Sequence, residues 1–451
     1  MKNFYQLLLL LLGISMTSSA QVTPMSSLPA ASPTIFLDFD GHLVQGTSWN
    51  WNGPLLLSSS NLTNEKITEV YNRVAEDYRP FQVNVTTDST KYWAAPANRR
   101  IRLILTVTSS WYGSAGGVAY MGSFTWGDNT PAFVFTELLN YSSKNIAEAA
   151  SHEIGHTLGL RHQATYDANC VKTSEYNVGI GSGEIGWAPI MGVGYYRNFT
   201  LWHSGTNPLG CTNIQNDLDV ITSFNGFTYR PDDYGTHFQS ANSASFVNDQ
   251  FTINGIVERS NDIDVLKFNM PSFGMFKLDA IPFNVGNGNT GSNVDLQIEL
   301  MTNSNTVIRT YNPADLLQVN MDTLLSAGTY WLRIQGKGNA YASEYASLGS
   351  YKLVGTYIPG ALLPLHKFEL KGQSVNGWHK LNWEIIADEN VVKQTVEASW
   401  SGRAFEAIAL PDVYARTYAY DPTATGTILY RIKTEFDDGK YYYSNIITLK
   451  N

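Results

Sequence analysis

The chain has 451 residues and a formal net charge of −9, with 30 Lys and Arg residues against 39 Asp and Glu residues. This acidic balance, without clusters of basic residues, excludes nucleic acid and anionic membrane surfaces as expected partners. Charged residues make up only 15% of the chain and aromatic residues 13%, with 26 Tyr and 37 Gly, which is typical of β-rich extracellular modules. The length predicts about two to four domains.

The first twenty residues have the pattern of a secretory signal peptide. Lys2 supplies the positive charge, residues 7–14 form the apolar segment, and Ser18, Ser19 and Ala20 provide small residues before the expected cleavage site. The apolar segment is too short to span a bilayer, and no later stretch reaches about twenty apolar residues. The sequence therefore predicts a secreted protein without membrane insertion, in which a short segment, residues 21–33, precedes the first domain.

Residues 34–225 are predicted to form an α/β (α+β) domain with a mixed, twisted sheet. Apolar or alternating runs predict strands, and the spacing of apolar residues at 63–78 predicts a helix. Strands that alternate with helices along the chain favour such a sheet. The strand-like runs lie at residues 34–40, 81–86, 101–107 and 132–136.

The motif HEIGHTLGLRH places metal-ligating side chains at a helical spacing. His152 and His156 are four residues apart, so on an α-helix they lie one turn above the other and can reach one ion. Glu153 falls between the metal-facing and the buried side, which suits a general base that activates water. Gly159 can end the helix in the left-handed conformation, so that His162 approaches the same ion from outside. Three neutral nitrogen ligands with an open fourth position predict a catalytic zinc site.

These residues resemble the zinc signature HExxHxxGxxH of the metzincin endopeptidases. In that clan a tight turn with a methionine follows, and the resemblance assigns this Met-turn role to Met191, in the sequence WAPIMG, with plain core packing as the alternative. Gln163 stands where adamalysin-like enzymes have Asp after the third histidine, and Val193 stands where astacin-like enzymes have a zinc-directed Tyr. The flanking sequence is most similar to bacterial reprolysin-like, adamalysin-related members.

The resemblance implies a secreted zinc metalloendopeptidase with one catalytic Zn²⁺, with Glu153 as general base and with proteins or peptides as substrates. In metzincins an edge strand above the cleft pairs with the substrate backbone, and by chain order Gly117 to Met121 is the candidate. An ordinary internal strand is the alternative. The residues expected to bind substrate are Gly117, Val118, Ala119, Tyr120, Tyr195 and Tyr196. For the two adjacent tyrosines, packing is the alternative role. The wall of the specificity pocket is expected in residues 195–203, where Trp202 and His203 are candidates.

The chain has two cysteines, Cys170 and Cys211. In an oxidising compartment we expect them to form a disulfide bond that brackets the Met-turn region, and two free thiols are the alternative.

Two β-sandwich domains are predicted after the turn-rich sequence RPDDYG at residues 230–235. Residues 230–358 resemble a bacterial pre-peptidase C-terminal module, in the sequences NDIDVLKF (261–268), AGTYWL (327–332) and LGSY (348–351). Asp262, Asp264 and Asp295 are candidate Ca²⁺ ligands, with turn capping as the alternative. Residues 365–451, which include WHKLNW (378–383), resemble a fibronectin-III-like module.

A second function remains open at this point, namely that of a secreted adhesion or glycan-binding protein. In that case the two β-modules would contact surface glycans or proteins, and the metalloprotease-like domain would be catalytically inert. The presence of Glu153 and Met191 favours the enzyme.

Overall fold

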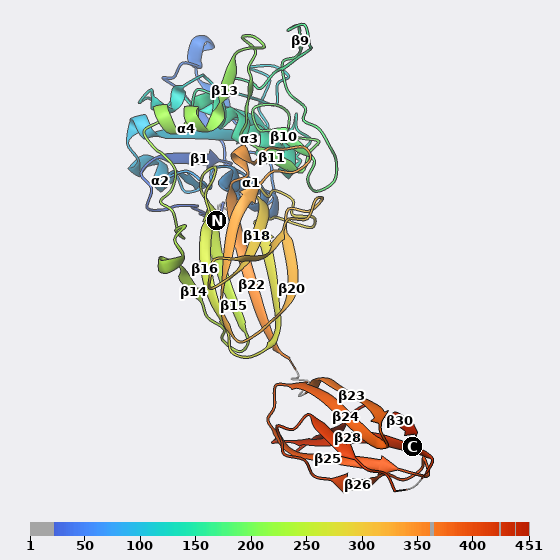
Figure 1. Ribbon diagram of the computed structural model, residues 1–451. Coiled ribbons are helices and arrows are strands. Elements are labelled where there is room, and N and C mark those ends of the chain that lie inside the picture. The colour runs from blue at the N-terminus through green and yellow to red at the C-terminus, as the bar shows by residue number, and fades with distance from the viewer. Residues whose placement is uncertain (1–21, 361–364, 424, 438, 451) are drawn as a thin grey trace, which may run out of the picture. The chain divides into compact units, whose positions relative to one another are not determined.

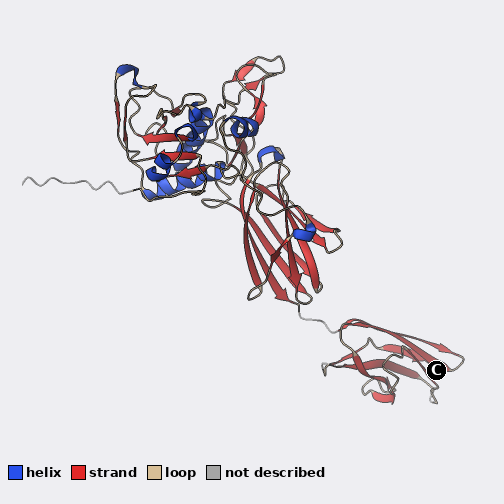
Figure 2. Ribbon diagram, turned by 90° about the vertical axis from the view of Figure 1, so that its left-hand side faces the viewer, coloured by secondary structure: helices blue, strands red, loops and turns tan. Residues whose placement is uncertain are grey.

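The computed structural model describes residues 22–360, 365–423, 425–437 and 439–450. The predicted signal peptide, residues 1–20, lies outside this range. The chain divides into two compact units, of which the first ends at Ile358 and the second begins at Pro359. The longer helices belong to the N-terminal part of the first unit, and strands dominate everything that follows (Figure 2). No helix in the described ranges has the length and apolar character that a membrane crossing needs.

The N-terminal part is built on a five-stranded sheet whose order is β4-β1-β5-β7-β6. Four of these strands run parallel, and β6 pairs antiparallel with β7 at one edge. All residues of β1 are buried, as expected for a parallel sheet that is covered on both faces. The four predicted strands overlap the four parallel strands of this sheet. The strands are β1 (Thr34–Asp38), β4 (Asn84–Thr86), β5 (Arg100–Thr106), β6 (Gly117–Val118) and β7 (Ala132–Phe135).

Four α-helices accompany the sheet. The predicted helix at 63–78 is α1 (Asn64–Asp77), which begins after Thr63, whose side chain accepts a hydrogen bond from the backbone N–H of Lys66. The buried face of α1 packs against α3. Short 3₁₀ turns and pairs of short strands connect the longer elements of this part of the chain. These elements are α2 (Ser89–Ala94), α3 (Ser143–Thr157), α4 (Asp217–Phe224), η1 (Asn50–Asn52), η2 (Ala97–Arg99), η3 (Ser123–Thr125), and the pairs β2 (His42–Val44) with β3 (Leu55–Leu57), β8 (Thr165–Tyr166) with β9 (Lys172–Ser174), β10 (Trp187–Pro189) with β11 (Phe199–Leu201), and β12 (Ser204–Thr206) with β13 (Ile214–Asn216).

The rest of the first unit has two sheets, with the strand orders β14-β16-β21-β18-β19 and β15-β22-β17-β20. Phe268 of the first sheet stacks on Phe276 of the second, with ring centroids 4.1 Å apart, so the inward-facing residues of both sheets share one core. The elements are η4 (Phe238–Ser240), β14 (Asn242–Ala244), β15 (Gln250–Val257), β16 (Asp264–Met270), β17 (Gly274–Pro282), β18 (Asp295–Thr302), β19 (Val307–Tyr311), β20 (Val319–Leu325), β21 (Gly328–Lys337), η5 (Glu344–Ala346) and β22 (Gly349–Pro359) (Figure 1).

The second unit also contains two sheets around its own apolar core. Trp383 lies in this core, where its indole N–H donates to Gln394 at 2.7 Å. The strands are β23 (Leu365–Val375), β24 (Trp378–Ala387), β25 (Val391–Ser399), β26 (Glu406–Ala409), β27 (Thr417–Tyr420), β28 (Thr427–Phe436), β29 (Tyr441–Tyr443) and β30 (Ile447–Lys450).

Within the first unit, the end of α1 joins the helical part to the two sheets that follow it. The buried carboxylate of Asp77 accepts hydrogen bonds from the hydroxyl of Ser151 in α3, at 2.5 Å, and from the side-chain amide of Asn293, at 2.6 Å. Burial, reinforced by the negative charge of Glu148, raises the pKa of Asp77 to about 7. The neighbouring Glu76 accepts from the backbone N–H of Ser350. The zinc-motif helix and the sandwich are therefore held by one polar network.

We expect Asn293→Ala to destabilise the first unit, because it removes a donor from a buried carboxylate. The expected loss is about 1–3 kcal/mol of unfolding free energy, measured by chemical denaturation. Asn320→Ala is the matched control, since Asn320 is exposed and bonds the exposed Asp279. Equal stability of the two variants would show that the Asp77–Asn293 contact contributes nothing to the stability of this unit.

Candidate active site

Two of the three motif histidines are placed by α3. The helix begins after Ser142, whose side chain accepts a hydrogen bond from the backbone N–H of Asn145. Ile146, Ala150 and Ile154 bury the opposite side of the helix completely. His152 and His156 consequently project from the other side, one turn apart, with ring centroids separated by 4.8 Å.

The turn after α3 returns the chain towards the helix. Gly159 has a φ of 99°, a conformation that a residue without Cβ adopts at little cost. The backbone N–H of Gly159 donates to the carbonyl of His156, and that of Leu160 donates to the carbonyl of Gly155. This pair of bonds is the Schellman ending of a helix. It reverses the chain so that His162 comes back to the two helical histidines.

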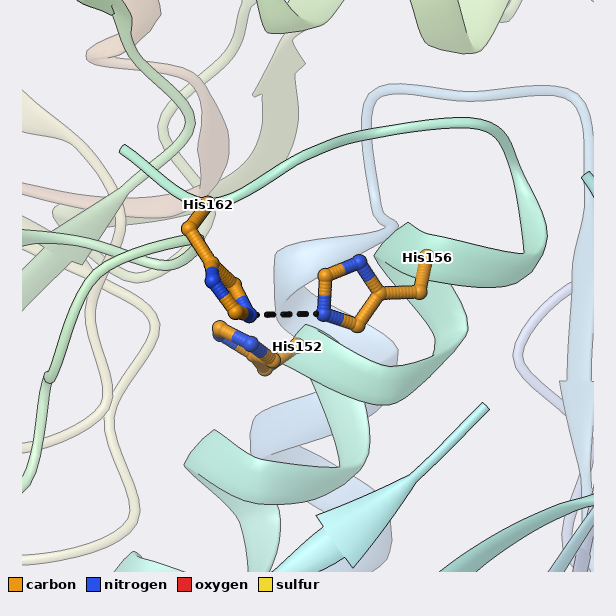
Figure 3. Close-up of side chains that lie close together, drawn as sticks. All are labelled: His152, His156 and His162. Atoms are coloured by element: carbon orange, nitrogen blue, oxygen red, sulfur yellow. Dashed lines mark hydrogen bonds between the residues drawn. The ribbon is translucent and has the colours of Figure 1, made fainter. Parts of the chain in front are cut away.

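The structure brings the three imidazoles to one place (Figure 3). The ring of His162 lies 5.2 Å from that of His152 and 4.9 Å from that of His156, and the Nε2 atoms of His156 and His162 are 3.1 Å apart. One nitrogen of each ring lies within 4.8 Å of the others, so the three residues can hold a metal ion.

Each ring is oriented through its Nδ1 atom. His152 donates to the carbonyl of Ile190 at 2.9 Å, and His156 to that of Leu160 at 2.7 Å. For His162 the acceptor is a carboxylate oxygen of Glu175, at 3.1 Å. Because these partners accept and do not donate, the protons reside on Nδ1 and the lone pairs on Nε2. Such outer partners fix the tautomer and the orientation of metal-ligating histidines.

This arrangement fits a zinc ion. With both Nδ1 atoms protonated, the Nε2 lone pairs of His156 and His162 face each other without a hydrogen between them, which is favourable only around a cation. Burial lowers the pKa of His156 to about 4 and holds that of His152 well below its usual range, so these rings remain neutral at pH 7. Three neutral imidazole nitrogens are a common donor set of catalytic zinc sites.

Glu153 lies beside the three imidazoles and against the edge strand. Its side chain is buried, and burial raises the pKa of its carboxyl group to about 8. A Cβ atom at Gly117 in β6 would lie 2.8 Å from its Oε1 atom, so the absence of a side chain at Gly117 makes room for the carboxylate.

Met191 lies under α3 and does not take part in the imidazole cluster. It is fully buried, and a Cβ atom at Gly155 would lie 2.4 Å from its sulfur. Gly155 lies between His152 and His156, so the sulfur contacts the helix backbone below the two rings. The preceding residue, Ile190, supplies the carbonyl that orients His152. This turn therefore contributes both a floor and a hydrogen-bond acceptor.

A cavity of about 230 Å³ adjoins His152 and Glu153. Of the residues that the sequence suggested for substrate binding, Gly117 and Tyr195 line it. Val118 completes β6, and Ala119 packs on the core. The other two do not line the cavity: the ring of Tyr120 packs at a tilt against Trp49, with ring centroids 4.1 Å apart, and Tyr196 is 74% exposed. The residues around the cavity are Ala115, Gly116, Gly117, Glu148, Ala149, His152, Glu153, Tyr176, Ile190, Gly192, Val193, Gly194 and Tyr195.

The expected pocket residues Trp202 and His203 do not line this cavity. Trp202 is buried, and its indole N–H donates to the backbone carbonyl of Asp77 at 2.8 Å. His203 packs against Trp187. The wall is formed earlier in the chain, by residues 192–195 directly after the Met191 turn. Trp202 is large and aromatic, and the core uses it because burial of such a side chain stabilises the fold.

Sequence reasoning missed three residues of the site. Glu175 bonds His162, Tyr176 lies with its ring 4.3 Å from that of His162, and Glu148 lines the cavity. The first two lie in the loop between Cys170 and Cys211, which form a disulfide. No local pattern marks them. For Glu148, its position four residues before His152 on the same helix was an available signal.

Gln163, which stands in place of the adamalysin aspartate, has a structural role. It is buried and donates through its side-chain amide to the carboxylate of Asp217, at 2.9 Å. Asp217 also accepts from Gln215 at 2.9 Å and from the backbone N–H of His203. The carboxylate of Asp217, the first residue of α4, therefore lies next to Gln163, the residue that replaces the adamalysin aspartate.

A second group of acidic residues lies at the start of the sandwich. Asp232 and Asp233 meet Glu258, Asp262 and Asp264, with carboxylate oxygens within 4.8 Å of one another in two overlapping sets of three. Both oxygens of the buried Glu258 and Oδ1 of the buried Asp264 have no hydrogen-bond partner among the described residues. Burial and the mutual repulsion of these carboxylates raise the pKa of Glu258 and of Asp264.

Asp295, the third residue suggested for calcium, is not part of this group. Its side chain accepts a hydrogen bond from the amide of Asn339 at 3.1 Å. Asp262 and Asp264 are instead joined by acids from the preceding linker and by Glu258, which directly follows β15.

Comparison with known families identifies the class of the helical part. The model for metallo-peptidase family M12B, reprolysin-like, matches residues 64–163, from the start of α1 to the residue after His162. This segment is a reprolysin-like metallopeptidase domain, which supports a zinc peptidase and confirms that part of the resemblance. Peptidases of this class act on proteins or peptides.

No curated protein matches the chain in sequence. Among solved structures, pectate lyase PelI from Erwinia chrysanthemi in complex with tetragalacturonic acid is 21% identical over 18% of this chain and 28% of its own length, with a TM-score of 0.17. The pre-peptidase C-terminal domain of collagenase from Bacillus anthracis is 18% identical over 28% of this chain and 97% of its own length, with a TM-score of 0.19. The β-1,2-glucanase from Parabacteroides distasonis is 12% identical over 45% of this chain and 30% of its own, at 0.17. With TM-scores this low, these similarities define neither fold nor function.

We expect Glu175→Ala to weaken metal binding about 10–100-fold, because His162 then loses the partner that orients it. The measurement is a zinc competition titration against a chelator of known affinity. Glu344→Ala is the control, since Glu344 pairs with Lys337 on the surface, in another part of the first unit. Unchanged zinc affinity in Glu175→Ala would mean that the contact with His162 does not orient the ring.

Proposed function

We propose that this chain is a secreted zinc-dependent endopeptidase that hydrolyses peptide bonds of extracellular proteins. The convergence of three imidazoles beside a buried carboxylate carries the proposal. The disulfide bond between Cys170 and Cys211 supports an extracellular location. We further propose that residues 34–225 form the catalytic domain and that residues 230–358 and 365–451 form pre-peptidase C-terminal-like and fibronectin-III-like modules.

In the proposed mechanism, His152, His156 and His162 hold zinc. When bound, zinc supplies Lewis-acid polarisation of the scissile carbonyl and lowers the pKa of water. Glu153 takes a proton from the attacking water and passes it to the leaving amine. Its buried environment supports this role, because a carboxylate with a raised pKa is a stronger base once it is ionised.

We propose that β6 binds the substrate backbone. The strand lies at the edge of the sheet, so the side that does not face β7 can pair with an extended peptide. Its Gly117 lies directly against Glu153. A peptide bound along β6 would therefore present its backbone beside the general base, while its side chains enter pockets such as the one lined by Tyr195.

The zinc-loaded protein should cleave an unbiased peptide library, and Glu153→Ala should lower the rate by a factor of roughly 10² to 10⁴ while it retains zinc. The rates come from product analysis by mass spectrometry, and the metal content is determined for both proteins. Chelation should abolish cleavage, and added zinc should restore it. Glu137→Ala, at an exposed glutamate in the turn before α3, is the control.

The same experiment separates the enzyme from its alternative. If both proteins bind zinc and neither cleaves, the metallopeptidase domain is inert. The function then lies in adhesion or glycan binding by the two β-modules.

We also propose that the acidic group at residues 232–264 binds a calcium ion. Calcium prefers carboxylate oxygens, and the unpartnered oxygens of Glu258 and Asp264 are buried where ionisation without a cation is unfavourable. The group combines two linker residues with Glu258 and Asp262 from the loop between β15 and β16 and with Asp264 from β16. A bound ion would therefore fix the linker to the sandwich.

Calcium at millimolar concentration should raise the Tm of the protein at pH 7, by an amount that corresponds to about 1–3 kcal/mol. The effect should shrink towards pH 5, because raised carboxyl pKa values mean that protons then compete with calcium. Glu258→Gln should reduce the calcium effect, whereas Asp279→Asn, at an exposed acid of β17, should retain it. A Tm that is insensitive to calcium in the unmodified protein contradicts the proposal.

A further inference from the structure

The cavity beside Glu153 contains a second carboxylate, that of Glu148. Both residues belong to α3, and both line the cavity, which is closed on the other side by residues 192–195. Glu148 is only 8% exposed. A buried carboxylate in the wall of such a cavity needs partners, and its partners determine what the cavity can accept.

The two carboxylate oxygens of Glu148 differ in the hydrogen bonds that they accept. The ammonium group of Lys144 donates to Oε1 at 2.8 Å, and the hydroxyl of Thr200 donates to the same atom at 3.2 Å. Within the described part of the chain, no hydrogen bond reaches Oε2. A Cβ atom at Gly194 would lie 2.2 Å from Oε2, so this oxygen lies against the cavity wall at a glycine. Oε2 is thus the acceptor left for a ligand.

The two ionisable carboxyl groups in the lining of the cavity are not balanced by a basic side chain in that lining. It contains Glu148 and Glu153 but, among its thirteen residues, all of them described, no Lys or Arg. Tyr195 responds to this field, because burial together with the charges of Glu153 and Glu148 raises the pKa of its phenol to about 12. The ammonium group of Lys144 bonds Glu148 from outside the lining.

We propose that Glu148 selects substrates with Lys or Arg directly after the scissile bond, an inference that rests on the proposed peptidase function. In this proposal the cavity, which adjoins His152 and Glu153, accepts the side chain of the residue whose nitrogen is released. A cationic side chain pairs with Oε2 through a charge-assisted hydrogen bond. An apolar side chain would leave the carboxylate desolvated without compensation, and an acidic one would be repelled.

The first test is the cleavage profile of a peptide library at this position. The unmodified protein should favour Lys or Arg over norleucine about tenfold or more in kcat/KM. Glu148→Gln, which keeps the shape and removes the charge, should bring the ratio within about threefold of unity. Lys144→Met should raise it, because the competing ammonium is gone. Glu137→Gln is the matched control at an exposed glutamate.

The second test does not depend on catalysis. Two peptide hydroxamates that differ only in Lys or norleucine at this position are titrated calorimetrically into the zinc-loaded proteins. The Lys form should bind about tenfold more tightly to the unmodified protein and lose this advantage in Glu148→Gln. Lys144 is 26% exposed, so Lys144→Met tests the inference even where Glu148→Gln fails to fold.

The outcomes separate the two proposals. Preference for Lys or Arg that disappears in Glu148→Gln supports the inference. A preference for apolar or acidic residues, or a basic preference that Glu148→Gln leaves intact, overturns it while the peptidase remains. Zinc-loaded protein that cleaves nothing yet still prefers the Lys hydroxamate overturns the proposed function and leaves the charge selection by Glu148 standing.

Discussion

The site depends on three imidazoles whose Nε2 atoms are turned to one point. For His152 and His156, burial disfavours the charged ring and keeps it neutral. Direction follows from Nδ1, because each ring donates to an oxygen outside the cluster: the carbonyls of Ile190 and Leu160 and the carboxylate of Glu175. These acceptors come from three different segments: the turn at Met191, the turn after α3 and the disulfide-bracketed loop. The orientation of the three rings therefore depends on tertiary structure, and displacement of any one of the three acceptors would misalign one ring.

A second polar network, centred on Asp77, holds helix α3 in place. Ser151, the residue before His152, donates to Asp77, and Asp77 also accepts from Asn293 in the sandwich. A buried carboxylate with these donors resists displacement, since loss of one leaves a desolvated acceptor. Glu184 adds a further link, because it accepts from the backbone N–H of Leu317 at 2.8 Å. The sandwich therefore acts as part of the support for α3, and this agrees with the single compact unit that ends at Ile358.

Much of the fold near the site could be predicted, because local rules decide it. The spacing of His152 and His156, the glycine at 159 and the apolar face of α3 each report on a few neighbouring residues. The strands of the parallel sheet were predicted for the same reason. The outer acceptors could not be predicted, because Glu175 contacts His162 through tertiary structure and lies thirteen residues away in a loop without a local pattern. Within the segment expected to form the pocket wall, Tyr195 lines the cavity, whereas Trp202 packs in the core, as its alternative role had it.

The acids of this chain with little exposure differ in how many hydrogen-bond donors their carboxylates receive. This difference indicates their roles, and it cannot be derived from the sequence. Asp217 receives donors from two glutamine side chains and a backbone amide, and such an acid is complete without a ligand. Glu258, by contrast, has both oxygens unpartnered, and Oε2 of Glu148 receives no hydrogen bond from the described residues. At Glu258, a buried acceptor without a donor is unfavourable, and it persists where a ligand supplies the missing partner. The geometry of Glu258 suits a hard cation shared among several carboxylates, whereas Glu148, with one free oxygen in the wall of a cavity, suits a single cationic side chain.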